Sequence, residues 1–184
     1  MTMERDLKEF FYDPDEEGLD LPVPAPPTPP AAVEAGTRDI VELLSFRLAG
    51  EEYAVEIGSV REIVKPPPIT EVPRAPEAVL GVIGLRGEAL PVFDPLLLLG
   101  LARHEEASSV SRRVIVIDTE QGLAGLSVDA VEHVVRMPRQ AIEPPPAGLA
   151  GPMAGGAIKG IGRVSGRLLA ILDPLELLMG SHSS

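Results

Sequence analysis

The chain has 184 residues, the length of one ordinary domain with a tail, and 28 acidic against 16 basic residues give it a net charge of −12. The absence of cysteine excludes disulfides, thiolate nucleophiles and cysteine metal sites, and the negative charge disfavours nucleic acid as a partner. The sequence shows no signal-peptide core and no apolar run of membrane length, so we expect neither export by such a signal nor direct membrane insertion.

The first 39 residues differ in composition from the rest. They hold ten acidic and three basic residues, and residues 21–30 include six prolines, which favour extended polyproline structure. We expect an acidic, Pro-rich disordered tail and linker over residues 1–39 and a folded domain over residues 40–180. Residues 3–12 have the apolar pattern of a short helix, which leaves two interpretations, a solubilising tail or a peptide that docks on a partner.

Apolar periodicity predicts short strands in the folded part. Tyr53, Val55 and Ile57 alternate with other residues, as is typical of a strand with one buried face. Residues 114–117 form a continuous β-branched run, which predicts a strand buried on both sides. Short strands separated by Gly and Pro turns favour a mainly β barrel or sandwich.

The chain also repeats a block of its own sequence after 79 residues. Residues 80–99 and 159–178 share eight identities in twenty ungapped positions. Two copies are too few for a solenoid. They predict two pseudo-symmetric halves, at about 40–100 and about 112–180, and the seam between them is the first place to look for function. In the first copy the shared residues are Gly81, Gly87, Leu90, Asp94, Pro95, Leu96, Leu98 and Leu99.

The repeated Asp-Pro-Leu has a local meaning in each half. An aspartate at the N-cap accepts hydrogen bonds from free helix amides, and a proline at the next position has no amide to leave unbonded. Asp94 and Asp173 are therefore predicted to cap short helices at residues 96–99 and 175–178. A hydrolase with a carboxylate dyad is the alternative, but neither aspartate lies in the Asp-Thr/Ser-Gly turn of such sites.

We find no other catalytic pattern in the sequence. His104, His133 and His182 lack metal-ligand spacing, and the glycine-rich residues 160–166 lead into a predicted strand instead of opening a helix as a phosphate loop does. We therefore predict a protein that is not an enzyme and that holds no metal or cofactor.

Two charged residues stand among branched aliphatic residues, Glu62 in Val-Arg-Glu-Ile-Val and Arg86 in Ile-Gly-Leu-Arg-Gly. They could be unrelated surface charges or could meet as a pair. Breaking a partly buried pair from one side would cost ~3–5 kcal/mol, whereas an exposed pair contributes ~0–1 kcal/mol. The second half has His133 and Ser165 at these positions, so the repeat is not symmetric there.

Taken in order, these motifs resemble the CheW family of bacterial chemotaxis coupling proteins. The resemblance covers about residues 40–179. It rests on an opening hairpin at residues 46–57, Val60-x-Glu62-Ile63, Gly81-Val-Ile-x-Leu85-Arg86-Gly87-x-x-Leu90-Pro91-Val92-x-Asp94, Gly125-Leu-x-Val128-Asp129-x-Val131 and residues 168–173.

The resemblance implies two intertwined five-stranded SH3-like β barrels with short helices and a shared hydrophobic core. It also implies a cytoplasmic adaptor, recruited to membrane-associated receptor arrays, that couples the tip of methyl-accepting receptors to the regulatory domain of the CheA histidine kinase. In the family, the receptor site is a hydrophobic groove between the two halves, where a helical hairpin can lie.

Candidate partner-binding residues follow from the resemblance. Glu62 and Arg86 match a family pair whose contact holds this region in shape, and Val60 and Gly81 match positions near the receptor and kinase contacts. The full candidate set is Val60, Glu62, Gly81, Leu85, Arg86 and Gly87.

The chain departs from the family pattern in three places. Gly84 stands where the family usually has Asn, and neither the prolines at residues 66–68 nor the leader of 39 residues belongs to the common pattern. These departures leave an alternative function open, a CheW-like scaffold specialised through its N-terminal tail for another partner such as a motility or cell-pole component.

Overall fold

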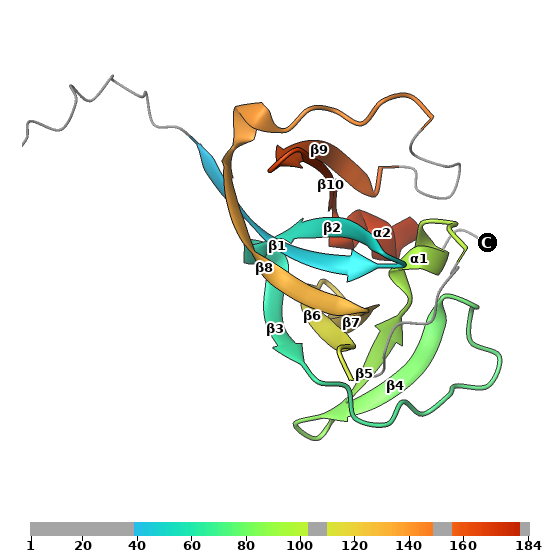
Figure 1. Ribbon diagram of the computed structural model, residues 1–184. Helices are drawn as coiled ribbons and strands as arrows, with labels where there is room; N and C mark the ends of the chain where they lie inside the picture. Colours follow the sequence, from blue (N-terminus) through green and yellow to red (C-terminus); the bar gives the residue numbers. More distant parts are fainter. Residues whose placement is uncertain (1–38, 103–109, 149–155, 181–184) are drawn as a thin grey trace, which may run out of the picture. The chain divides into compact units, whose positions relative to one another are not determined.

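The structure is a computed structural model that describes residues 39–102, 110–148 and 156–180, so the predicted tail lies outside the described residues except for Asp39. The described residues form strands joined by short turns or, as between β3 and β4, by longer segments, with two short α-helices (Figure 1). The elements are β1 (Ile40–Leu48), β2 (Glu51–Glu56), η1 (Ile57–Ser59), β3 (Val60–Val64), β4 (Val79–Leu85), β5 (Glu88–Phe93), α1 (Pro95–Leu98), β6 (Arg113–Thr119), β7 (Gly122–Val128), β8 (Ala130–Pro138), η2 (Arg139–Ala141), β9 (Ile158–Val164), β10 (Arg167–Leu172) and α2 (Pro174–Met179).

The strands divide into two five-stranded sheets, ordered β3-β6-β7-β5-β4 and β8-β1-β2-β10-β9. We call them the first and the second barrel. Exchanging β1–β5 with β6–β10 converts one order into the other, so each barrel takes strands from both halves of the sequence. The prediction of two intertwined five-stranded units in a mainly β fold is therefore confirmed.

Each sheet closes through the segment that follows its first edge strand. Thr70, after β3, pairs with Val82 of β4, and Glu143, after β8, pairs with Ile161 of β9. Each bridge joins the segment that follows one edge strand to the other edge strand, so it covers part of an edge that could otherwise pair with another chain. The two bridges lie at equivalent places in the repeat.

Three apolar clusters fill the structure. One lies within the second barrel and includes Leu43 and Ile171, and another lies within the first barrel and includes Val92 and Val114. The largest joins the two barrels, with buried side chains from both sheets and both helices. Two of its aromatic rings, Phe46 and Tyr53, stack with centroids 6.4 Å apart.

The helix caps occupy the positions that the sequence predicts. The carboxylate of Asp94 accepts a hydrogen bond from the Leu96 amide at 2.9 Å, and that of Asp173 accepts one from the Leu175 amide at 3.0 Å. A proline begins each helix. Both aspartates thus act as N-caps, and this arrangement offers no support for the hydrolase alternative.

One strand differs from its predicted burial. Tyr53, Ala54 and Val55 are all buried, whereas Ile57 lies beyond the strand in η1 and is exposed. The period-two interpretation is wrong because β2 is central in its sheet and has apolar clusters on both faces. The strand at residues 114–117 is fully buried, as predicted.

Candidate functional site: an apolar groove beside α2

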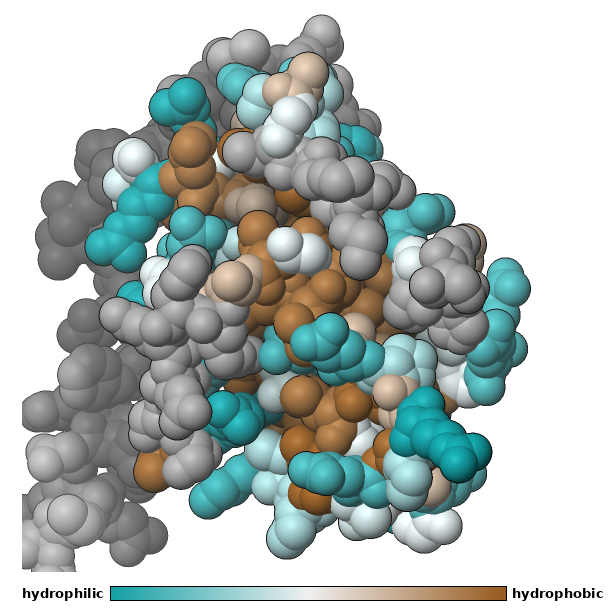
Figure 2. Space-filling model, turned by 90° about the vertical axis from the view of Figure 1, so that its right-hand side faces the viewer, coloured by the Kyte–Doolittle hydropathy of each residue, from teal (hydrophilic) through white to brown (hydrophobic). Residues whose placement is uncertain are grey.

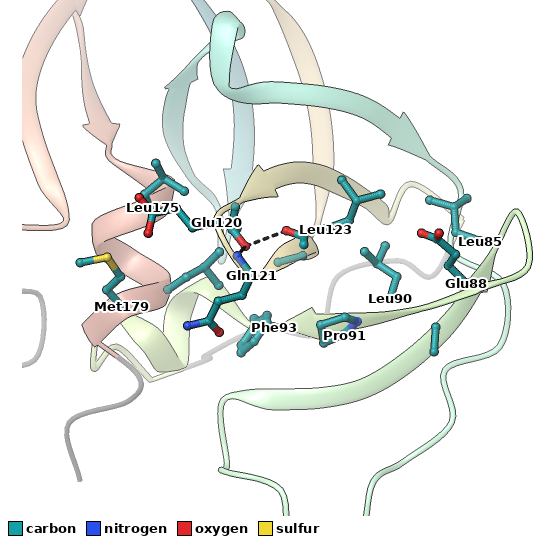
Figure 3. A pocket seen from close by; sticks show the side chains of 15 residues that line it. Leu85, Glu88, Leu90, Pro91, Phe93, Glu120, Gln121, Leu123, Leu175 and Met179 are labelled. Carbon is teal, nitrogen blue, oxygen red and sulfur yellow. Dashed lines mark hydrogen bonds between the residues drawn. The ribbon is translucent and has the colours of Figure 1, made fainter.

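A groove of about 710 Å³ lies between the first barrel and α2 (Figure 3). The end of β4, strand β5, the end of β6, the β6–β7 turn and the start of β7 form one part of its lining, and α2 forms the rest. The lining residues are Leu85, Glu88, Ala89, Leu90, Pro91, Phe93, Thr119, Glu120, Gln121, Gly122, Leu123, Ala124, Leu175, Leu178 and Met179. We call this surface the α2 groove.

Helix α2 supplies two of the apolar side chains that remain exposed at the groove. Leu177 and Leu178 are buried in the core that joins the barrels. Leu175 and Met179, four residues apart and so neighbours on one helix face, are 42% and 63% exposed. Apolar side chains gather at the centre of the face that carries α1 and α2, with hydrophilic side chains around them (Figure 2). A helix with apolar residues on both faces indicates a partner surface.

The repeat places a second surface at the equivalent position of the second barrel. Strand β7 pairs in parallel with β5 in the first barrel, and β2 pairs in parallel with β10 in the second. Aligning these two pairings places Ala124 of β7 at the position of Tyr53 in β2. Tyr53 is buried, and its hydroxyl donates a hydrogen bond to Glu51 at 2.9 Å. A small side chain at residue 124 therefore leaves space that a tyrosine ring fills on the other barrel.

Glu62 and Arg86 form the predicted pair. Arg86 Nη2 lies 3.0 Å from Glu62 Oε2, with the arginine side chain 76% exposed and the glutamate 21% exposed. Arg86 is exposed because the β4–β5 connection is a two-residue turn in which Arg86 and Gly87 both have positive φ, at +51° and +84°. The glutamate is thus partly buried and the arginine is exposed, and because the arginine faces solvent we expect the pair to contribute nearer ~0–1 kcal/mol than ~3–5 kcal/mol.

The other candidate residues divide into two groups. Leu85 lines the groove, and Gly87 follows Arg86 in the adjoining turn, so these residues lie together with the ion pair. Gly81 is buried with φ of +142°, and a side chain there would meet the Thr70 carbonyl oxygen. Val60 is the first residue of β3 and packs against the apolar cluster that joins the two barrels. The structure thus gives Gly81 a place within the fold and not on an open surface.

Most of the groove was not predicted from the sequence. Ala124, Met179 and the β6–β7 turn belong to none of the candidate motifs, and Leu175 entered only as part of the repeated Asp-Pro-Leu, not as a binding residue. The signal available for α2 was its composition, since Leu175, Leu177, Leu178 and Met179 cannot all face one core from a helix of six residues. No comparable signal marks Ala124, because a small residue in a strand is ordinary.

Within residues 39–102, 110–148 and 156–180, no group of three or more acidic or histidine side chains could hold a metal ion. In the same ranges, no helix is long and apolar enough to span a membrane.

Known proteins match both the sequence and the fold. The family model described as CheW-like domain matches residues 42–181. A chemotaxis protein CheW of Rhizobium meliloti is 35% identical over 72% of this chain and 83% of the relative, and one of Helicobacter pylori is 34% identical over 76% and 82%. The scaffolding protein TtCheW of Thermoanaerobacter tengcongensis superposes with a TM-score of 0.68 at 33% identity, covering 74% of this chain and 86% of that one. The chain therefore belongs to the CheW-like domain family, the scaffold proteins of bacterial chemotaxis.

Proposed function

We propose that this protein couples methyl-accepting chemotaxis receptors to a CheA-type histidine kinase at membrane-associated receptor arrays in the cytoplasm. The α2 groove is the observation that carries the proposal, because it offers a partner a largely apolar surface. Its volume of about 710 Å³ and its exposed residues Leu175 and Met179 suit the apolar face of a partner helix. We assign the receptor tip to this groove.

The turn at Arg86 and Gly87 is our candidate for the kinase contact. It projects beside Leu85 at one end of the groove, and Glu62 on β3 fixes the arginine through the 3.0 Å ion pair. A fixed guanidinium loses less side-chain freedom on binding than a free one. Gly81 and Val60 would act through the shape of this region instead of by direct contact.

Binding measurements on the full chain test both arms. We would titrate the cytoplasmic fragment of a methyl-accepting receptor and, separately, the regulatory domain of a CheA kinase from the same organism. Ala124→Tyr places in the groove the side chain that the second barrel has at the equivalent position. We expect it to weaken receptor binding by about tenfold or more and to leave kinase binding unchanged.

A matched pair of truncations controls for loss of fold. Met179→Ala removes an apolar side chain that is 63% exposed in the groove, and Leu168→Ala removes one that is 60% exposed on the second barrel. We expect only Met179→Ala to weaken receptor binding, with both variants unfolding at nearly the same denaturant concentration. Equal losses for the two variants, or no binding of either partner by the native chain, would contradict the proposal.

A further inference from the structure

The charged side chains of the α2 groove all carry the same sign. Among the lining residues, which all belong to the described part of the chain, Glu88 and Glu120 are charged and none is basic. Both are exposed. Glu88 lies at the Leu85 end of the groove, and Glu120 lies toward Leu175 of α2, so the two carboxylates stand apart along an apolar floor (Figure 3).

Neither carboxylate is neutralised within the described residues. Glu88 and Glu120 form no ion pair there, although Arg86 is only two residues from Glu88. The Arg86 guanidinium instead contacts Glu62 on β3. The residue equivalent to Glu88 in the other half is Arg167, so the repeat does not place a negative charge at that position of the second barrel.

A helix that covers this groove must withdraw water from both carboxylates. Burying an unpaired charge is costly, whereas a cation placed beside it offsets that cost, and like charges across an interface repel. An apolar helix with neutral or acidic flanks would therefore bind less well than one with basic flanks. The net charge of −12 adds a long-range attraction for a basic partner.

We propose that the α2 groove selects a helix whose apolar stripe is flanked by lysine or arginine near both ends, one cation facing Glu88 and the other Glu120. This inference rests on the proposed function of the groove and adds the chemistry by which it distinguishes one helix from another. The apolar residues of the groove provide the binding affinity, and the two carboxylates provide the specificity for one helix over another.

The test uses the full chain and two synthetic helical peptides that share one apolar stripe and carry either Lys or Glu at both flanks. By fluorescence anisotropy we expect the Lys peptide to bind about tenfold or more tightly than the Glu peptide at low salt. The ratio should fall at about 1 M salt, where the screening length is about 3 Å. It should approach one in the Glu88→Gln/Glu120→Gln variant.

A control variant carries Glu71→Gln and Glu77→Gln, which remove the same net charge from exposed positions outside the groove. It should keep the full preference for the Lys peptide. An unchanged ratio in Glu88→Gln/Glu120→Gln, an equal drop in the control, or no measurable binding of the Lys peptide would overturn the inference.

The groove itself is tested separately with Ala124→Tyr and the receptor fragment. If Ala124→Tyr abolishes receptor binding while the peptide preference ignores Glu88 and Glu120, the groove function stands and the charge selection fails. If Ala124→Tyr leaves receptor binding intact, the groove function itself fails.

Discussion

The α2 groove and the equivalent surface of the second barrel are built from corresponding residues of the repeat, but their side chains differ in exposure. We call the second surface the α1 face. It comprises Tyr53, Leu96, Leu99, Leu168 and Ala170, which correspond to Ala124, Leu175, Leu178, Ala89 and Pro91 of the groove. Leu96 is 2% exposed and Tyr53 is 5% exposed, whereas Leu175 is 42% exposed. The backbone repeats, and the side chains decide which surface is open.

A tyrosine stands on the α1 face where the α2 groove has an alanine. The Tyr53 ring packs in the core that joins the barrels, and burial together with the hydrogen bond to Glu51 raises the pKa of its hydroxyl. The phenol therefore stays neutral at physiological pH. Ala124 belongs to the same core but has no ring to extend over its neighbours. The duplication thus yields one surface that is closed around Tyr53 and Leu96, although its Leu168 is 60% exposed, and one surface that is open around Leu175 and Met179.

Opening the closed surface gives the largest expected effect. Tyr53→Ala removes a buried ring from the shared core and should lower the free energy of unfolding by about 3–5 kcal/mol in denaturant titrations. Tyr53→Phe keeps the ring and loses only the bond to Glu51, so it should cost about 1 kcal/mol. If Tyr53→Ala cost no more than Tyr53→Phe, the ring would not be what closes the α1 face.

The aspartates that cap the two helices make the same kind of hydrogen bond but differ in burial. Asp94 is buried, whereas Asp173 is half-buried and accepts bonds from the amides of Leu175 and Glu176. Replacing either by alanine should cost about 0.5–2 kcal/mol, with Asp94→Ala the more damaging because its helix amide is left without water. Asp94→Asn, which keeps an acceptor oxygen, serves as the control in the same thermal unfolding series. A larger loss from Asp173→Ala would contradict this order.

The sequence predicts the features that the repeat and local chemistry determine. The caps at Asp94 and Asp173 and the turn at Arg86 follow from residue preferences that act over a few positions. The exchange of strands between barrels came from a family resemblance, because periodicity does not reveal which strands pair. The resemblance implied a groove between the two halves, but its lining on α2 and the β6–β7 turn was not predicted, since the exposure of Leu175 is not encoded in its own sequence neighbours. Tertiary contact, and not local pattern, decides which apolar residue stays exposed.

One difference between the two barrels is a buried polar group in β1 of the second barrel. Ser45 is fully buried, and within the described residues its hydroxyl has no hydrogen-bond partner, whereas the repeat places Val116 at the equivalent position of the first barrel. Ser45→Ala should leave stability unchanged or raise it by about 1 kcal/mol, because a buried hydroxyl without a partner is costly. Ser45→Thr keeps the hydroxyl and should bring no gain. A clear loss of stability in Ser45→Ala would mean that the hydroxyl has a partner.

The Glu62 and Arg86 pair exists in the first half only, and its stabilising effect should be small. A double-mutant cycle with Glu62→Ala and Arg86→Ala should give a coupling energy of ~0–1 kcal/mol, because the arginine is largely exposed. A coupling above about 3 kcal/mol would show that the pair behaves as a partly buried one in spite of the exposed arginine. A coupling energy indistinguishable from zero would mean that the pair does not stabilise the fold. Its role would then be to position Arg86 for a partner.

The second barrel has its own ion pairs, and one of them should make stability depend on pH. Lys159 Nζ lies 2.7 Å from Glu56 Oε1, and this bond, helped by Arg139, lowers the pKa of Glu56 below its usual value of 4.5. A carboxyl whose pKa is lower in the folded state stabilises the fold above its unfolded pKa and loses that contribution as pH falls through the folded value. Lys159→Met should therefore cost ~0–1 kcal/mol at neutral pH and less and less as pH falls below about 4.5. Lys65→Met, the same change at an exposed lysine with no ion pair among the described residues, should show no such trend. Parallel pH profiles of unfolding for the native chain and Lys159→Met would show that Glu56 owes its lowered pKa to other groups.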